Sequence, residues 1–161
     1  MKVMPVPFRI AKMLLIQEHY IHSMPGGSRL AFGVFAGTAL LGALTLGCGP
    51  MNAHRLVDEA KADDCVTLTR LWLDNELPKN SESRVIGVVL RALRRHTSLK
   101  FVLSYADPAA GHLGTIYQAT GWLYSGLSEV YPITVVEGLW ALVALQRFVQ
   151  RYQRENEKAA A

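Results

Sequence analysis

Cysteine is scarce in this sequence, which contains only Cys48 and Cys65 among 161 residues. Neither belongs to a Cys-x-x-Cys pair or stands at a metal-ligand spacing from a histidine. The pattern therefore implies neither a disulfide framework nor a zinc site, and we assign no metal-binding residue. Free thiols are typical of a reducing compartment, so we expect a cytoplasmic protein.

The N-terminus lacks the unbroken apolar run of a secretory signal peptide. Pro5 and Pro7 interrupt this region, and the basic residues around them are Lys2, Arg9 and Lys12. We therefore expect no export. The sequence also lacks internal repeats, and its only low-complexity stretch is the final run of alanines.

Charge is absent from residues 30–51, so hydropathy alone would make this segment a membrane span. Gly33 and Gly37 even form the Gly-x-x-x-Gly pair of membrane helices. However, the many glycines of the segment are unfavourable in a soluble helix, and residues 36–38 form a turn between two apolar runs that suit buried strands. We predict a β-hairpin and no membrane contact, with a small membrane protein as the alternative.

The chain is half apolar and carries a net charge of +4. A chain of this length buries roughly 70% of its unfolded surface, which is enough for one sheet covered by helices. The positive charge favours a polyanionic partner, such as nucleic acid or a phosphorylated cofactor.

Periodicity and turn residues predict the remaining elements. Asn80 or Ser81 is expected to cap the central helix. The predicted helices are 8–20, 51–62, 83–96, 112–120 and a long C-terminal helix over 130–157, and the predicted strands are 65–73, 101–105 and 122–124.

Arginines form one stripe of the helix predicted over 83–96, at Arg84, Arg91 and Arg95. A solvated helix face explains such a stripe, because charged residues commonly lie opposite an apolar face. Contact with nucleic-acid phosphates, through Arg91 and Arg95, is the other interpretation.

Tyr117 followed by Gly121 and Trp122 resembles the last helix-to-strand corner of the GCN5-related N-acyltransferases. The order of predicted elements over residues 8–126 is also similar to that family. The resemblance implies an α+β fold, with a mixed sheet flanked by helices in residues 1–129. Residues 130–161 would then be an appended helix within the same domain or at a homodimer contact.

In that fold a helix N-terminus holds the pyrophosphate of acetyl-CoA or a related acyl-CoA, because unpaired amides gather there. The resemblance places this role in the segment that begins at Lys79. No glycine precedes Gly87 there, unlike the usual glycine-rich loop. The expected cofactor-binding residues are Asn80, Ser81, Ser83 and Arg84.

Four blocks of the sequence resemble the Mom-type DNA adenine-modification proteins of bacteriophages. They lie in residues 18–27, 30–35, 68–84 and 101–126. The resemblance implies an enzyme that converts adenine in phage DNA to an N6-carbamoylmethyl (acetamido-type) adenine, which protects the DNA from host restriction. The partner would be double-stranded DNA in the host cytoplasm, with the adenine flipped out of the helix.

The same resemblance implies that His19, Tyr20, Asp107 and Tyr117 form the catalytic site. Asp107 or His19 would accept a proton, Tyr117 would donate one, and Tyr20 would contact the base. Each residue taken alone has a structural explanation as a packed, capping or turn residue. His112, Ser104 and Ser83 are weaker candidates.

Two other functions compete with DNA modification. The same fold could transfer acetyl from acetyl-CoA to a small amine or a protein. Alternatively, the basic helix stripe and the missing glycine loop would suit a non-catalytic nucleic-acid-binding protein, which would not bind an acyl cofactor.

Overall fold

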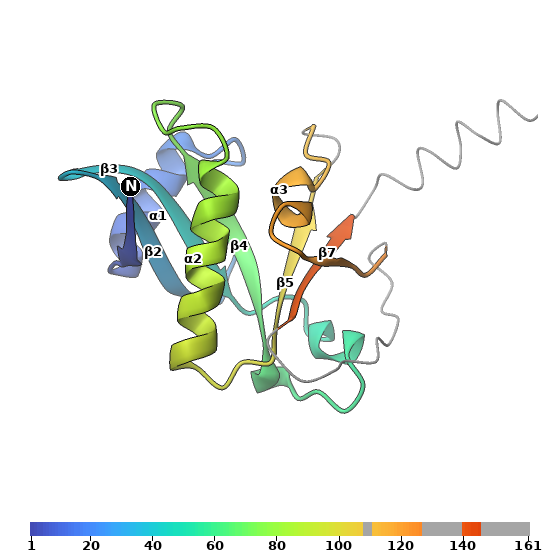
Figure 1. Cartoon of the computed structure of the whole chain (residues 1–161). Coiled ribbons are helices and arrows are strands. Elements are labelled where there is room, and N and C mark those ends of the chain that lie inside the picture. Colours follow the sequence, from blue (N-terminus) through green and yellow to red (C-terminus); the bar gives the residue numbers. More distant parts are fainter. Residues whose placement is uncertain (108–110, 127–139, 146–161) are drawn as a thin grey trace, which may run out of the picture.

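The computed structural model describes residues 1–107 and 111–126, together with the backbone of 140–145. These residues form a mixed sheet with the strand order β1-β2-β3-β4-β5-β7-β6 (Figure 1). The elements are β1 (Lys2–Pro5), α1 (Phe8–Glu18), β2 (Ser28–Ala36), β3 (Ala39–Gly47), β4 (Cys65–Leu73), α2 (Ser81–His96), β5 (Phe101–Ala106), α3 (Thr115–Gln118), β6 (Leu123–Tyr124) and β7 (Trp140–Leu145). The α+β class is confirmed.

The uncharged segment forms the predicted hairpin of β2 and β3. Ala36 pairs with Ala39, which leaves Gly37 and Thr38 as a two-residue turn. Gly37 has a φ of 60°, the positive value that the first position of a type II′ turn requires. Val34 and Leu44 are fully buried, which explains why this segment carries no charge. Among the described residues, no helix is both long and apolar enough to cross a membrane.

Helices α1 and α2 cover opposite faces of the sheet (Figure 1). Ala11 and Leu15 of α1 pack with Ala31 and Ala43 of the hairpin. The neighbouring hairpin residues point the other way and join the core beneath α2, whose buried apolar residues are Val85, Ile86, Val89 and Leu93. This alternation follows from the two-residue period of a strand.

Strands β4 and β5 are parallel and pair only at their beginnings, as far as Thr67 and Leu103. Beyond this point β4 contains a bulge, because Leu68 pairs with Leu46 and Arg70 with Thr45, which leaves Thr69 without an opposite residue. A bulge bends its strand and increases the local twist. The bend carries β4 away from β5 and opens the sheet at its centre.

The predicted C-terminal helix over residues 130–157 is wrong where the structure describes this region. Residues Trp140–Leu145 form β7, which lies parallel to β5 and pairs with it from Phe101 to Ala106. A short apolar run fits a buried strand as well as a helix. In residues 140–145 the backbone polar groups form hydrogen bonds with the edge of β5, which favours the strand. Residues 140–145 are therefore part of the sheet, and the rest of the predicted helix lies outside the described residues.

Several shorter elements also differ from the expectations. The helix predicted over 51–62 is a 3-10 turn, η1 (Ala53–Leu56), and the helix predicted over 112–120 is reduced to α3. Strand β1 was not expected. Asn80 precedes α2 in a left-handed conformation, and neither Asn80 nor Ser81 caps the helix with its side chain. The Ser81 hydroxyl instead donates to the Pro78 carbonyl at 2.6 Å.

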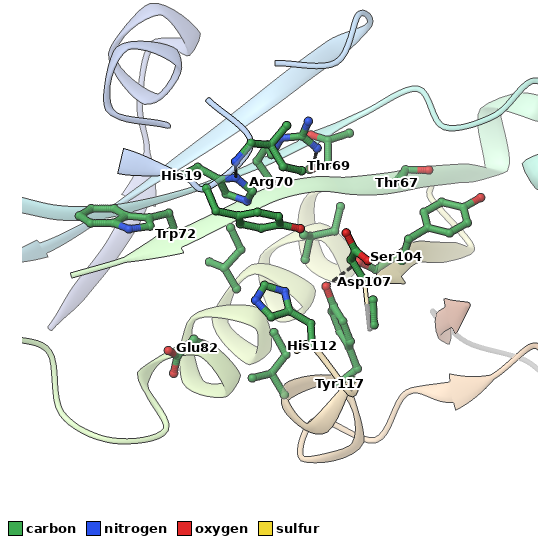
Figure 2. A pocket seen from close by; sticks show the side chains of 18 of the residues that line it. His19, Thr67, Thr69, Arg70, Trp72, Glu82, Ser104, Asp107, His112 and Tyr117 are labelled. Atoms are coloured by element: carbon green, nitrogen blue, oxygen red, sulfur yellow. Dashed lines mark hydrogen bonds between the residues drawn. The ribbon is translucent and has the colours of Figure 1, made fainter. Parts of the chain in front are cut away.

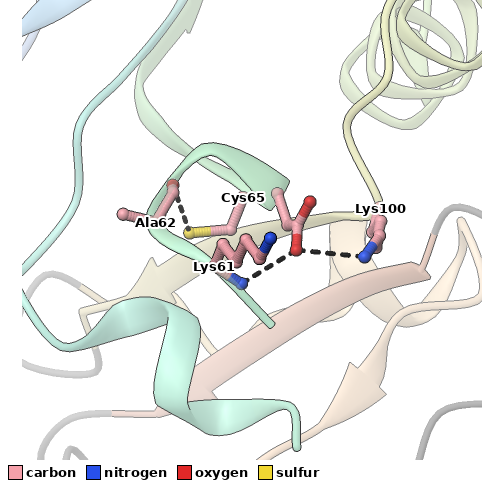
Figure 3. Close-up of polar contacts among 5 residues, drawn as sticks. Lys61, Ala62, Cys65 and Lys100 are labelled. Carbon is pink, nitrogen blue, oxygen red and sulfur yellow. Dashed lines mark hydrogen bonds and ion pairs between the residues drawn. The ribbon is translucent and has the colours of Figure 1, made fainter. Parts of the chain in front are cut away.

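Asp64, which directly precedes β4, contacts Lys100, which directly precedes β5 (Figure 3). One carboxylate oxygen accepts the backbone N–H of Lys61 at 2.8 Å and the Lys100 ammonium at 3.1 Å. These interactions lower the pKa of Asp64, with the Lys61 hydrogen bond as the largest cause. They join the two strands at the end where they still pair.

Candidate functional site

A cavity of about 1070 Å³ occupies the opening between β4 and β5 (Figure 2). Its walls come from the C-terminus of α1, residues 48–50, the second half of β4, the end of β5, residues 111–114 and α3. The divergence of two parallel strands thus brings together segments from both halves of the described chain.

All four predicted catalytic residues line this cavity. His19 and Tyr20 follow α1, Asp107 follows β5, and Tyr117 lies on α3. The weaker candidates Ser104 and His112 line it too, whereas Ser83 does not. The placement agrees with a shared site, and the catalytic roles of these residues remain predictions.

Tyr117 is a buried phenol, with 7% of its surface exposed. The hydroxyl of Ser104, on β5, donates to the phenol oxygen at 2.8 Å, and the Trp122 ring packs against the Tyr117 ring at a centroid distance of 4.8 Å. Burial raises the pKa of Tyr117, although the Ser104 hydrogen bond partly opposes this rise. Tyr117 therefore stays protonated near neutral pH, and since its oxygen accepts from Ser104, its own proton can be donated to another group.

His19 is also buried, with 6% of its surface exposed. Its Nδ1 accepts the backbone N–H of Ile21 at 3.2 Å, so in the neutral ring Nε2 carries the hydrogen. Burial and the nearby Arg70, His112 and His22 lower its pKa from 6.5 to about 4. The expectation that His19 accepts a proton near pH 7 therefore loses its support. A neutral His19 whose Nδ1 is occupied is instead a hydrogen-bond donor through Nε2.

Asp107 directly follows the last residue of β5 and points into the same part of the cavity as the Tyr117 hydroxyl (Figure 2). Its backbone carbonyl accepts the N–H of His112 at 3.1 Å. Its charge contributes to a raised pKa of Tyr20, after burial as the larger cause. Asp107 thus places a carboxylate in the same part of the cavity as the buried phenol.

Arg70 is a cavity residue that was not predicted from the sequence. Its Nε donates to the Ser23 carbonyl at 3.1 Å, and its Nη1 donates to the Thr69 carbonyl at 2.8 Å. Burial lowers its pKa, and within the described part of the chain it forms no ion pair with a carboxylate. A single arginine in a strand with no other charged residue was the available signal. Its charge is suited to holding an anionic or carbonyl oxygen of a bound molecule.

The residues expected to bind a cofactor pyrophosphate, Asn80, Ser81, Ser83 and Arg84, do not line this cavity. The hydroxyl of Ser81 donates a hydrogen bond to the Pro78 carbonyl, and the hydroxyl of Ser83 donates one to the Asn80 carbonyl. The residue at this helix start that does reach the cavity is Glu82, whose carboxylate would repel a diphosphate. The start of α2 therefore fits the diphosphate of an acyl-CoA poorly. The described residues also contain no cluster of three or more metal-ligating side chains.

Comparison with known proteins agrees with the resemblance seen in the sequence. The model of the Mom protein family matches residues 1–153. The protein named methylcarbamoylase Mom, from Escherichia phage Mu, is 32% identical over 160 residues, which cover 94% of this chain and 66% of the phage Mu protein. The aligned part thus spans slightly less than two thirds of that relative. A family match over nearly the whole chain shows that it belongs to the Mom protein family.

Proposed function

We propose that this chain is an enzyme that modifies adenine in phage DNA, converting it to N6-carbamoylmethyl adenine and so protecting the DNA from host restriction. The main support for this proposal is that His19, Tyr20, Asp107 and Tyr117 line one cavity in a member of the Mom family. The name methylcarbamoylase, borne by the phage Mu relative, supports a transferred group that combines a carbamoyl unit with one further carbon.

The proposed reaction is a group transfer without oxidation or reduction. The adenine N6 forms a bond to the carbon of the incoming group, and the bond from that carbon to its leaving group breaks. One proton leaves N6 for the Asp107 carboxylate, and one passes from the Tyr117 phenol to the leaving group. Arg70 would hold the oxygen of the carbamoyl group, and the neutral His19 would donate a hydrogen bond from Nε2.

We also propose that this α+β fold is of the acyltransferase type. It is supported by the parallel strands that separate at a bulge, by the helix that follows β4, and by Tyr117 beside the resulting cavity. Because the start of α2 fits a diphosphate poorly, the proposed reaction contains no step from acetyl-CoA. An acyl-CoA donor and the expected role of Arg84 remain predictions that calorimetry with acetyl-CoA would test.

Mass spectrometry of bacterial DNA tests the proposed function. We expect DNA from cells expressing the chain to yield deoxyadenosine heavier by one carbamoylmethyl group in place of hydrogen, and DNA from cells without it to yield only the normal nucleoside. Acetylated amines in small molecules or proteins, together with unmodified deoxyadenosine, would support the acetyltransferase alternative. Normal deoxyadenosine despite folded, DNA-binding protein would support the non-catalytic alternative.

The exposed arginines of α2 favour a nucleic-acid partner. We propose that Arg91 and Arg95 bind DNA phosphates, because within the described residues neither has a carboxylate partner. Replacing both with glutamine should weaken duplex DNA binding at low salt. The slope of log K against log salt should fall by about 0.9 for each phosphate that is no longer neutralised. The matched control is Arg9→Gln on α1, which is also exposed. An unchanged slope in the double variant would contradict the assignment.

A further inference from the structure

Two exposed aliphatic side chains lie at the mouth of the cavity, one on each wall. Tyr20 and His112 meet across the cavity with their ring centroids 5.2 Å apart. The residues that follow them in the sequence are Ile21 and Leu113, which both line the cavity. Ile21 is 41% exposed and Leu113 is 53% exposed. A single exposed leucine is common on any protein, whereas two aliphatic side chains at the mouth of one cavity indicate a contact with a bound molecule.

Leu113 stands in a turn whose backbone is fixed on both sides. Gly111 and Gly114 have φ values of 78° and 76°, which glycine adopts without strain. The N–H of His112 donates to the Asp107 carbonyl at 3.1 Å, and the Gly114 carbonyl accepts two N–H groups from the first turn of α3. The turn is thus tied to the end of β5 and to the helix that carries the buried phenol. It holds the Leu113 side chain in one place beside the site.

The partner of this leucine has to present an apolar surface. The outside of duplex DNA carries charged phosphates, which an aliphatic side chain does not bind. The flat faces of the bases are apolar, and they become accessible where one base leaves the stack. Proteins that kink DNA insert aliphatic side chains between base steps for this reason. An adenine that moves into the cavity leaves such a space in the duplex directly at the mouth, where Leu113 lies.

We propose that Leu113 is a wedge that enters the duplex, fills the space left by the extruded adenine and packs against the base faces exposed there. The inference deepens the proposed function and rests on it for the identity of the partner as duplex DNA. Leu113 rather than Ile21 is the wedge, because it is more exposed and because its glycine neighbours have no side chains to obstruct a duplex. Leu113 is a positioning residue, which stabilises the extruded state without touching the reacting atoms.

Binding of end-labelled DNA, measured by fluorescence anisotropy, tests the wedge. One probe is a G·C duplex with one adenine opposite an abasic site, where extrusion costs least, and the other is the adenine strand alone. Leu113→Ala should raise the Kd for the duplex by about 10-fold, the order expected from losing the burial of one leucine side chain. It should leave the Kd for the single strand unchanged, because a flexible strand presents its adenine without a wedge. Leu113→Met should keep both Kd values.

The matched control is Leu30→Ala. Leu30 lies on β2, is 40% exposed and does not line the cavity, so this variant should bind both probes as the wild type does. Because Leu113 is exposed, Leu113→Ala should melt at the wild-type temperature. An unchanged Kd for the duplex in Leu113→Ala, or an equal loss for the duplex and the single strand, would overturn the wedge.

Modified adenine in cells separates the wedge from the proposed reaction. If cells expressing the chain form modified deoxyadenosine while Leu113→Ala binds the duplex normally, the reaction stands and the wedge is wrong. If binding of the duplex depends on Leu113 but no modified deoxyadenosine forms, the wedge stands and the proposed reaction is wrong.

Discussion

Tyr117→Phe is expected to lower adenine modification by about 10²-fold or more, the usual effect of losing a general acid. The variant lacks the hydroxyl that Ser104 holds at 2.8 Å and that would protonate the leaving group. The phenylalanine ring keeps its packing against Trp122, so the fold is retained. The measurement is the yield of modified deoxyadenosine by mass spectrometry, with thermal melting as the control for folding.

The pH dependence of the reaction supplies a second readout for Tyr117. The reaction needs the protonated phenol, whose pKa is raised above its ordinary value of 10.0 by burial. Activity of the wild-type enzyme should therefore persist through neutral pH and decline only as the pH rises through this raised pKa. The residual activity of Tyr117→Phe should show no such decline. Near-normal modification by the variant would remove Tyr117 from the mechanism.

Asp107→Asn should also reduce modification by about 10²-fold or more, because the amide cannot accept the N6 proton. Asparagine has nearly the same shape, and the backbone carbonyl that binds His112 is unaffected. The loss should appear in kcat, with little change in the affinity for DNA, because the substitution removes a proton acceptor without changing the shape of the side chain.

His19→Asn is the comparison that separates the two candidate proton acceptors. With its pKa lowered to about 4 and its Nδ1 occupied, His19 is a poor base at pH 7. If Asp107→Asn keeps its activity while His19→Asn loses it with an unchanged melting temperature, the two roles are reversed and the assignment of Asp107 fails.

Local patterns of the sequence determined much of the fold. The hairpin followed from turn residues between two uncharged runs, and β4 was predicted with the bounds that the structure has, Cys65–Leu73. Helices α1 and α2 followed from apolar residues at helical spacing. These elements were predictable because each one buries the face that its own periodicity defines. The resemblance to one family also selected, from distant positions, four residues that line one cavity.

The tertiary structure decided what depends on neighbours distant in sequence. Residues 140–145 are a strand because the edge of β5 offers backbone partners, and no local pattern shows that edge. Arg70 enters the site because a bulge carries β4 away from β5. The predicted cofactor residues lie at the start of α2 and do not line the cavity. The expected role of His19 as a base has no support at pH 7, because its pKa is set by its burial and by charges from other segments. The sequence alone determined which residues could do chemistry; burial and hydrogen bonding determined which proton each of them can hold or release.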